Sequence, residues 1–393
     1  MILEETSPYS TDLEQSIQVS TDKIYSYEYS AYLSGSEESD NEVTVYWDKE
    51  NENSLILSMF DSETNTLFIR SSDYRYGFFK EYGKEVISDD FLPILLSPDG
   101  HFMLVERRTE DTRSVVVKEI TTGSEEEIIS VPMNHFPVDN YHIEAVWKED
   151  SKAVILGWEV SSNQKSMVKP TPDNTVILKE PENTKINMMY LHKVAEKETL
   201  TFEYEDKVFS GSVYENYELK VNGKGDVLRY TPGSYSCSYI QFIEDQPHIT
   251  TLPITGYMNV EYWITDRGIY TQGNQGDLFY YELNGEKESS WRILITANEK
   301  RIIDLQASSD GETLFIAEES EKDWYKEDSY NYTKADIYAY SLTHKRKDYL
   351  YKGAIGVVTI SLNKEENKLL AGLRKNYNPS DYNTEILIFN FKP

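Results

Sequence analysis

The 393-residue chain is poor in cysteine, in basic residues and in long apolar runs. Its one cysteine, Cys237, excludes an intramolecular disulfide and any cysteine-rich metal site. A lone cysteine placed between two tyrosines is typical of a small, buried and inert residue. No window approaches the roughly 18 consecutive apolar residues that a membrane-spanning helix needs, so no transmembrane segment is predicted.

Basic residues number 39 against 68 acidic residues, which gives a formal net charge of −29. This field repels a polyanionic backbone, and no local cluster of lysine and arginine outweighs it. We therefore expect no nucleic-acid partner and no docking on anionic lipid. Exposed acidic residues in this number are typical of a soluble surface.

Local catalytic motifs are missing as well. The sequence has no Gly-x-Ser-x-Gly nucleophile elbow, no His-Glu-x-x-His metal helix, no phosphate-binding Gly-Lys-Ser/Thr loop and no dinucleotide-binding glycine pattern. We predict no catalytic residue and no cofactor from local pattern. A pair of acid and base carboxylates remains open, but 68 acidic residues give no basis for choosing one.

Aromatic residues are abundant, with 31 Tyr, 14 Phe and 6 Trp, and they favour pleated, half-buried strands. The clearest local unit is 95–108, which reads LLSPDGHFMLVERR. Two apolar runs flank Ser97-Pro98-Asp99-Gly100, where proline presets φ, aspartate caps the turn and glycine supplies positive φ. This pattern predicts a β-hairpin.

Similar hairpin turns recur along the chain. We place them at Trp47–Asn53, Ser97–Gly100, Trp147–Ser151, Ala195–Glu198, Thr265–Gly268, Ser308–Gly311 and Ser361–Asn367. Their first residues are separated by 50, 50, 48, 70, 43 and 53 residues, a period typical of the four-stranded blade of a β-propeller. The third strand of a blade is predicted at Ser114–Thr122, Asp277–Asn284, Asp336–Leu342 and Glu385–Phe391.

The fold class predicted is all-β, a β-propeller of seven four-stranded blades. The last blade ends after its third strand, so Lys23–Leu33, with tyrosines alternating at period two, is expected to pair beside Glu385–Phe391 and close the ring. The 70-residue gap leaves Tyr230–Met258 as an inserted loop or a degenerate eighth blade, and six blades also stay open. Residues 1–22 are predicted as a polar arm and 23–393 as one domain.

Two stretches of the chain resemble the repeat of TolB-like propellers. The first is the hairpin at 95–108 with the strand and turn at 114–123, and the second is 305–318 with 336–342. The same pattern occurs in the propeller domains of dipeptidyl-peptidase-type enzymes. The resemblance implies a propeller without the hydrolase domain of those enzymes, and it implies nothing specific about activity.

The start of the chain leaves the compartment open. Its first residues, MILEETSPYSTDLEQ, lack the basic and apolar regions of a signal peptide, which taken literally indicates the cytoplasm. Met1 could also stand where a leader is missing, with the polar first forty residues as a tether to a membrane anchor. With the architectural resemblance, we favour an extracytoplasmic or cell-surface location.

Two groups of acidic and histidine residues are candidate metal sites. His135, Asp139 and His142 could bind a divalent cation, and Asp323, Glu327 and Asp328 could bind calcium. Neither spacing matches an established ligand pattern, so ordinary loop residues are the favoured interpretation and no metal site is predicted.

The function predicted is a non-enzymatic binding module for a protein or peptide partner. Connections between second and third strands are expected on the ligand face, and three of them are rich in aromatic residues or arginine, which dominate binding hot spots. The predicted binding residues are Trp324, Tyr325, Arg374, Tyr377, Arg107 and Arg108. The alternative is a propeller enzyme acting on a glycan or small molecule, which a converging cluster of carboxylates with perturbed pKa values would favour.

Overall fold

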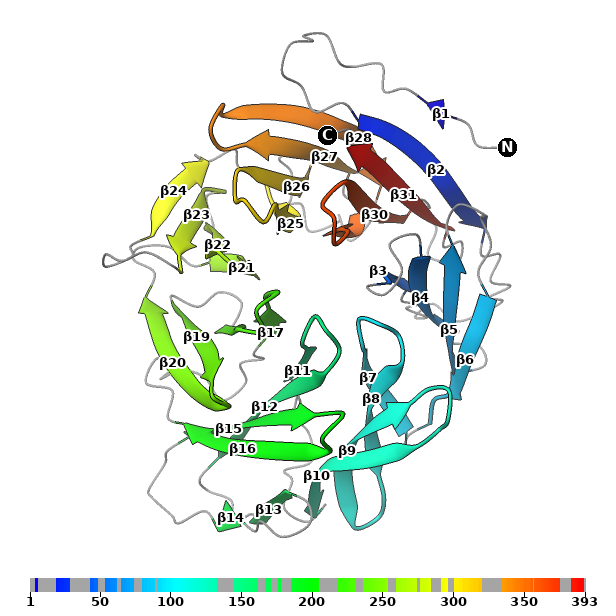
Figure 1. The fold of residues 1–393 in the computed structure, drawn as a ribbon, viewed down its shortest axis with the longest axis vertical. Helices are drawn as coiled ribbons and strands as arrows, with labels where there is room; N and C mark the ends of the chain where they lie inside the picture. The colour runs from blue at the N-terminus through cyan, green and yellow to red at the C-terminus, as the bar shows by residue number, and fades with distance from the viewer. Residues whose placement is uncertain are drawn as a thin grey trace, which may run out of the picture. The chain divides into compact units, whose positions relative to one another are not determined.

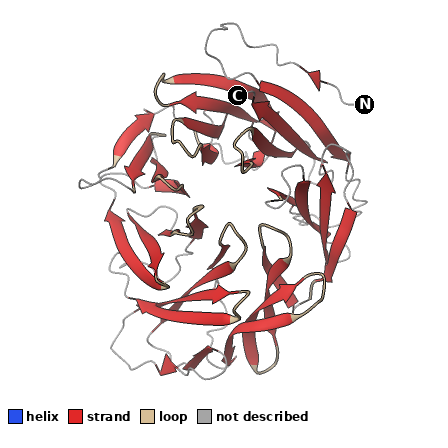
Figure 2. Ribbon diagram, viewed as in Figure 1, coloured by secondary structure: helices blue, strands red, loops and turns tan. Residues whose placement is uncertain are grey.

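The computed structural model is built from β-strands alone in the residues that it describes (Figures 1 and 2). Those residues are 4–5, 19–28, 43–48, 54–61, 65–73, 80–88, 91–132, 144–161, 167–170, 176–177, 185–204, 218–230, 236–253, 259–273, 276–283, 291–295, 300–319, 334–355, 357–374 and 383–391. Within this part, no helix is long and apolar enough to cross a membrane. The all-β prediction is confirmed.

The described strands form seven sheets, each a meander in which most neighbours along the chain pair antiparallel. The chain divides into two compact units, residues 85–266 and residues 1–84 with 267–393. The predicted arm at 1–22 and single domain at 23–393 stay predictions.

Three sheets lie within residues 85–266. They comprise β7 (Phe91–Leu96), β8 (Phe102–Arg108), β9 (Thr112–Glu119) and β10 (Glu125–Pro132); β11 (Glu144–Trp147), β12 (Ala153–Ser161), β15 (Lys185–Lys193) and β16 (Glu198–Tyr204); and β17 (Glu218–Val221), β18 (Val227–Tyr230), β19 (Ser236–Ile243) and β20 (Gln246–Pro253). Two short strands, β13 (Met167–Pro170) and β14 (Val176–Ile177), extend the first of these sheets beyond β10. That sheet therefore has six strands instead of the expected four.

The remaining sheets follow the same order. They comprise β3 (Val43–Trp47), β4 (Ser54–Asp61), β5 (Thr66–Asp73) and β6 (Lys80–Val86); β21 (Asn259–Ile264), β22 (Gly268–Gly273), β23 (Leu278–Glu282) and β24 (Arg292–Ile295); β25 (Ile302–Ala307), β26 (Thr313–Glu319), β27 (Lys334–Ser341) and β28 (Arg346–Ile355); and β29 (Val357–Leu362), β30 (Lys368–Arg374), β31 (Asn383–Phe391), β2 (Val19–Glu28) and β1 (Glu4–Glu5). All four predicted third strands are confirmed, as β9, β23, β27 and β31.

The predicted pairing of the two ends of the chain is confirmed. Strand β2 runs antiparallel to β31, with Tyr25 opposite Ile386 and Tyr27 opposite Thr384. The strand occupies Val19–Glu28, so it begins four residues before the predicted Lys23, and 29–33 lie outside the described residues. Without β2, the long apolar strand β31 would be an unpaired edge of its sheet.

One predicted turn is wrong in its role. Ala195–Glu198 joins β15 to β16, the third and fourth strands of a sheet, and is not a first hairpin. The first hairpin of the next sheet is β17–β18, closed where the Asn222 amide donates to Asp226 O at 3.1 Å and the Asp226 amide donates to Asn222 Oδ1 at 2.9 Å. This turn has no proline. The hydrogen bond to the Asn222 side chain stabilises it in place of the Pro-Asp-Gly residues that form the turn at Ser97–Gly100.

The segment Tyr230–Met258 is correspondingly neither an insertion nor an eighth unit. It supplies β19 and β20, the third and fourth strands of the sheet that β17 begins. The 70-residue spacing arises because it is counted from Ala195–Glu198, which is not a first hairpin, while the true first hairpin β17–β18 turns within the interval. The connection at 162–184, between β12 and β15, carries β13 and β14 and lengthens the preceding sheet's own stretch of chain.

Adjacent sheets are joined through their first hairpins. Within residues 85–266, the Asp99 amide donates to Ser151 Oγ at 3.0 Å, and the Lys224 amide donates to Asp266 Oδ1 at 3.0 Å. In the other unit, the Ser309 amide donates to Glu366 Oε1 at 2.7 Å. These bonds link each turn to the turn of the following sheet, as blades of a propeller require.

Trp47 and Trp147 make the same kind of contact from equivalent positions in their sheets. Trp47 ends β3 and donates its indole N–H to Ser361 O of β29 at 2.9 Å, while Trp147 ends β11 and donates to Leu95 O of β7 at 3.4 Å. Each indole therefore crosses from a first strand to the first strand of the preceding sheet. The side chains pack in the apolar layers between sheets, where full burial stabilises by about 1.5–3 kcal/mol for each large residue.

Candidate functional site

The candidate site is a group of charged side chains on the first strands of three successive sheets. Glu144 and Glu218 each occupy the first residue of their strand, β11 and β17, and Glu261 lies on β21. Strands β11 and β17 contact each other, as do β17 and β21. Together with Lys220, Arg229 and Tyr230 they form what we call the inner-strand cluster, which lies wholly within residues 85–266.

Tyr230 connects two sheets of this cluster. From the end of β18, its hydroxyl donates to Glu261 Oε1 at 2.8 Å and also contacts Glu218 Oε2. Its ring lies 4.6 Å from that of Tyr262, centroid to centroid. The phenol is therefore fixed at both ends, by ring packing and by two carboxylates.

Lys220 makes the second connection between the same sheets. Its ammonium pairs with Glu261 Oε1 and donates to Tyr262 O at 2.7 Å. The same ammonium lies 5.5 Å from the centroids of the Tyr230 and Trp263 rings, within cation–π range. Lys220 thus neutralises Glu261 directly.

The electrostatics single out Glu144. Burial first and then the charge of Glu218 raise the pKa of its carboxyl to about 7, against the charge of Arg229, which lowers it. Burial, followed by the charges of Glu261 and Glu218, raises the pKa of Tyr230, so its hydroxyl stays a proton donor. Burial and the neighbouring charge of Glu218 therefore favour the protonated form of Glu144 near neutral pH.

Such a carboxyl can do two things. It can accept a cationic group, whose charge would replace the proton, or it can exchange a proton with a bound molecule at physiological pH. In the part of the chain that the structure describes, no group of three histidine, cysteine, aspartate or glutamate side chains is placed to hold a metal ion. The chemistry that the cluster offers lies in the proton of Glu144 and in the ion pair of Lys220 with Glu261.

Sequence reasoning missed this cluster. It left the choice among 68 acidic residues open, and it overlooked β17, the strand that carries Glu218 and Lys220. A usable signal was present, because an acidic residue at the start of an otherwise apolar first strand is costly to bury without a function or a partner.

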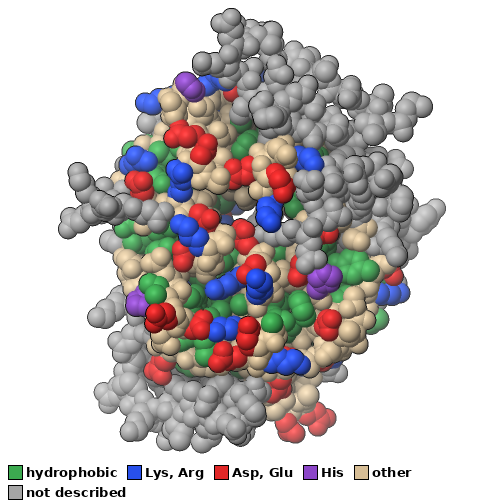
Figure 3. Space-filling model, in the orientation of Figure 1, with side chains coloured by type: hydrophobic (Ala, Val, Ile, Leu, Met, Phe, Trp, Pro, Cys, Tyr) green, Lys and Arg blue, Asp and Glu red, His purple; other side chains and the backbone are tan. Residues whose placement is uncertain are grey.

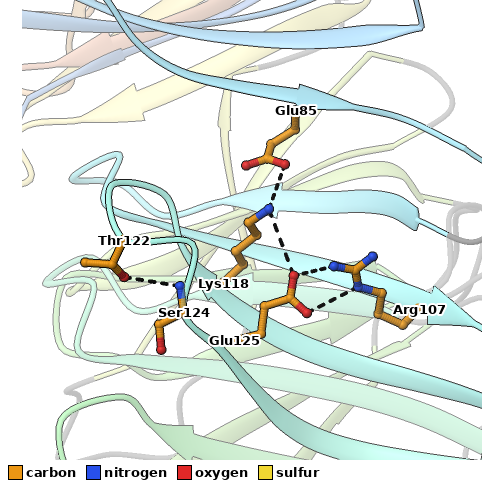
Figure 4. A network of polar contacts seen from close by, with 6 residues as sticks. All are labelled: Glu85, Arg107, Lys118, Thr122, Ser124 and Glu125. Atoms are coloured by element: carbon orange, nitrogen blue, oxygen red, sulfur yellow. Dashed lines mark hydrogen bonds and ion pairs between the residues drawn. The ribbon is translucent and has the colours of Figure 1, made fainter.

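Arg107 and Arg108, predicted as binding residues, lie at the end of β8 and are held in ion pairs. Arg107 pairs with Glu125 and stacks 4.4 Å from the Phe91 ring centroid, and Glu125 also lies 3.9 Å from Lys118 (Figure 4). Arg108 Nε lies 2.5 Å from Glu106 Oε1. The two arginines remain 36% and 42% exposed, so their outer edges are still accessible.

Arg113 shares the carboxylate of Glu106 with Arg108. Its Nε and Nη2 donate at 2.5 and 2.6 Å to the two Glu106 oxygens. Burial raises the pKa of Glu106, but the hydrogen bonds and charges of Arg113 and Arg108 outweigh it and the pKa falls below its usual range. The arginine-rich turn is thus organised around one buried carboxylate.

Among the other predicted site residues, the structure places only the backbone of Arg374. Arg374 ends β30, opposite Thr384 of β31. Outside the described residues lie Trp324, Tyr325, Tyr377, His135, Asp139, His142, Asp323, Glu327 and Asp328. The connections 320–333 and 375–382 do join second to third strands, and their sheets are neighbours through β25 and β29. The binding prediction for these residues stays a prediction.

The exposed surface mixes charges of both signs. On the face shown in Figure 3, lysine and arginine of the described residues are interspersed with aspartate and glutamate, and no broad basic field is present among them.

Comparison with known proteins supports the fold. No protein-family model matches the chain, and no curated protein sequence matches it. An oligogalacturonate lyase from Vibrio parahaemolyticus superposes with a TM-score of 0.54 at 8% identity, covering 99% of this chain and 96% of the lyase. An oligogalacturonate lyase in complex with manganese gives 0.53 at 10% identity, covering 100% and 99%.

The C-terminal WD40 domain of Sif2 is also similar, with a TM-score of 0.45 at 10% identity, covering 95% of this chain and 98% of that domain. These neighbours are β-propeller-type proteins, and the chain described here has an all-β, propeller-type, repeat-built fold. At such low identity the likeness extends to the fold alone, and it does not reach the TolB-like family in particular.

Proposed function

We propose that this chain is a propeller-type binding module for a protein or peptide partner, and that a basic side chain of the partner docks at the inner-strand cluster. The observation that carries the proposal is the partly buried carboxyl of Glu144, whose pKa is raised to about 7 and which begins β11 as Glu218 begins the neighbouring first strand β17. A lysine or arginine brought to this position would favour the charged form of Glu144 and add an attraction to both carboxylates.

The surroundings favour a cationic group over other ligands. The chain carries a net charge of −29, which attracts positively charged segments and raises their rate of encounter. Tyr230, Lys220 and Glu261 are held together by direct hydrogen bonds and ion pairs, so this side of the cluster is organised before any ligand arrives. A preorganised site loses less conformational entropy on binding.

A second set of partner contacts is proposed on the aromatic connections. Trp324 and Tyr325 belong to the connection between β26 and β27. Arg374 ends β30, and Tyr377 belongs to the connection between β30 and β31. Tryptophan, tyrosine and arginine bury much area while keeping a hydrogen-bonding end, which suits them to protein interfaces. We extend the same role to Arg107 and Arg108 through their accessible edges.

A peptide array tests the basic-ligand proposal. Fluorescently labelled protein is applied to random peptides of varied net charge at pH 8 and moderate salt, in parallel with Glu144→Gln/Glu218→Gln. The wild type should favour lysine- and arginine-containing peptides, and the double variant should lose that preference. Glu196→Gln, at an exposed turn, is the matched control and should bind as the wild type does. Equal peptide preference in all three proteins would refute the proposal.

An enzyme on the same fold is the second candidate, because a carboxyl with a pKa near 7 beside another carboxylate suits acid–base catalysis. Glu144 would act as the proton donor, with Glu218 as its partner, on a glycan or small molecule. The oligogalacturonate lyases of similar fold make an oligogalacturonate a reasonable first substrate, together with a panel of aryl glycosides. Turnover that falls about 100-fold or more in Glu144→Gln would favour this candidate, since general acid–base groups contribute about that much.

A further inference from the structure

A polar patch lies buried on one face of β15 and β16, outside the inner-strand cluster. Three side-chain atoms there have no hydrogen-bond partner: Tyr190 Oη, His192 Nε2 and Thr201 Oγ1. Tyr190 and His192 are fully buried, with 0% of their surface exposed. Buried polar atoms are hydrogen-bonded with few exceptions, so three such atoms on two paired strands need an explanation.

The strand register places the three side chains together. Tyr190 lies directly opposite Thr201, and His192 lies opposite Thr199. Alternate residues of a strand share a face, so Tyr190 and His192 project to the same side, and their cross-strand partners project there too. His192 Nδ1 lies 3.0 Å from Thr199 Oγ1, which leaves the opposite nitrogen of its ring available.

The patch faces the neighbouring sheet across an apolar layer. Tyr190 packs in a buried cluster with Leu104 of β8 and Val115 of β9, and with Ile128 of β10. None of these side chains can donate or accept a hydrogen bond. The side chains of the opposing sheet in this cluster therefore offer the polar atoms no partner.

We propose that ordered water is bound in this inter-sheet layer, bridging the Tyr190 hydroxyl, the Thr201 hydroxyl and His192 Nε2. A water molecule can donate two hydrogen bonds and accept two. Internal waters typically make about three hydrogen bonds to buried polar groups. Both hydroxyls can donate or accept, so the set is satisfied whichever nitrogen of His192 carries the proton. Water is also the smallest molecule that meets all three atoms.

The neutral state of His192 fits this ligand. Burial lowers the pKa of its imidazole to about 4, so the ring carries no charge at physiological pH and needs no counter-ion. A neutral imidazole beside two hydroxyls calls for a neutral hydrogen-bonding molecule. The bound water would then be a constituent of the interface between the sheets that begin with β7 and β11.

Water magnetic relaxation dispersion measures long-lived internal water directly. The wild type is compared with Tyr190→Phe/Thr201→Val, and with Tyr349→Phe/Thr250→Val, whose sites are exposed. The dispersion amplitude should fall by about one internal water in the first variant, in keeping with a site of about three polar partners, and stay unchanged in the second. Equal amplitudes in all three proteins would overturn the proposal.

A second measurement covers the case in which the buried variant does not fold. A crystal structure of the wild type at high resolution should show solvent density within hydrogen-bonding distance of His192 Nε2 and the two hydroxyls. Absence of that density, with the three atoms bonded to protein groups instead, would also overturn the proposal. Neither measurement depends on the function proposed for the inner-strand cluster.

Discussion

The hydroxyl of Tyr230 donates to Glu261 Oε1 at 2.8 Å and so joins β18 of one sheet to β21 of the next. The same hydroxyl contacts Glu218, which makes the phenol the link between two carboxylates of the inner-strand cluster. Because its ring is fully buried, no solvent can replace these bonds without rearrangement. The site is therefore coupled to the packing of the sheets that carry it.

Removing the Tyr230 hydroxyl should destabilise the fold. Tyr230→Phe takes one hydrogen-bond donor from each of two carboxylates, and a lost hydrogen bond to a charged group costs about 1.5–3 kcal/mol. Urea unfolding should show a lower free energy of unfolding by about that amount. Tyr349→Phe, at a ring 37% exposed, is the control and should change stability little. A Tyr230→Phe curve that overlays the wild type would contradict the network.

Glu144 should make stability fall as pH rises. Its folded pKa, about 7, is above the usual value of 4.5, so the folded protein binds the proton more tightly than the unfolded chain. The stabilising proton is fully held below about pH 4.5 and is lost as the pH rises through about 7. Glu144→Gln removes this dependence and, after allowance for solvent screening, should stabilise by about 1–2 kcal/mol at pH 8.

The difference in unfolding free energy between wild type and Glu144→Gln is the quantity to measure, since other groups titrate in both proteins. It should be smallest at pH 4.5 and reach its full value above pH 7. A difference that is constant across this range would show that Glu144 is an ordinary surface carboxyl.

Glu106 should behave in the opposite sense. Glu106→Gln removes the carboxylate charge that pairs with Arg113, whose side chain is only 13% exposed, and breaking such a pair should cost about 3 kcal/mol in urea unfolding. Because the folded pKa of Glu106 is lowered, its contribution is present above the usual value and is lost as pH falls through the folded pKa. The destabilisation should therefore shrink in strong acid. Exposed Glu110→Gln is the control.

Deleting residues 1–34 should lower the melting temperature sharply. The deletion removes β2 and exposes the edge of β31, whose Ile388 and Phe389 are fully buried in the intact protein. A shorter deletion of residues 1–17 keeps β2 and should have a much smaller effect. Thermal unfolding followed by circular dichroism compares the two, and an unchanged curve for the longer deletion would refute closure by β2.

Trp324 and Tyr377 should contribute to partner capture. Replacing both with alanine should weaken binding by on the order of 2 kcal/mol or more, as truncation of hot-spot aromatics does, while stability stays nearly unchanged. A pull-down with quantified capture and a melting curve are needed together. Normal capture would make these residues bystanders, and an unfolded variant would assign them to the core.

The local sequence determined the strands and several turns. Ser97-Pro98-Asp99-Gly100 encodes its own hairpin, with Gly100 at a φ of 72° and the Ser97 hydroxyl donating to Asp99 Oδ1 at 2.6 Å. Alternating tyrosines likewise predicted β2, because period-two patterning is a property of neighbouring residues. These features depend on a few consecutive residues, and sequence alone is sufficient for them.

Tertiary structure decided the rest. The turn at Ala195–Glu198 has the same local chemistry as a first hairpin, and only strand pairing shows that it joins β15 to β16. Glu144, Glu218 and Glu261 are separated by more than forty residues at each step and meet because successive first strands pack together. The raised pKa of Glu144 exists only in that packed state, since burial and the charge of Glu218 arise from contacts that no local pattern encodes.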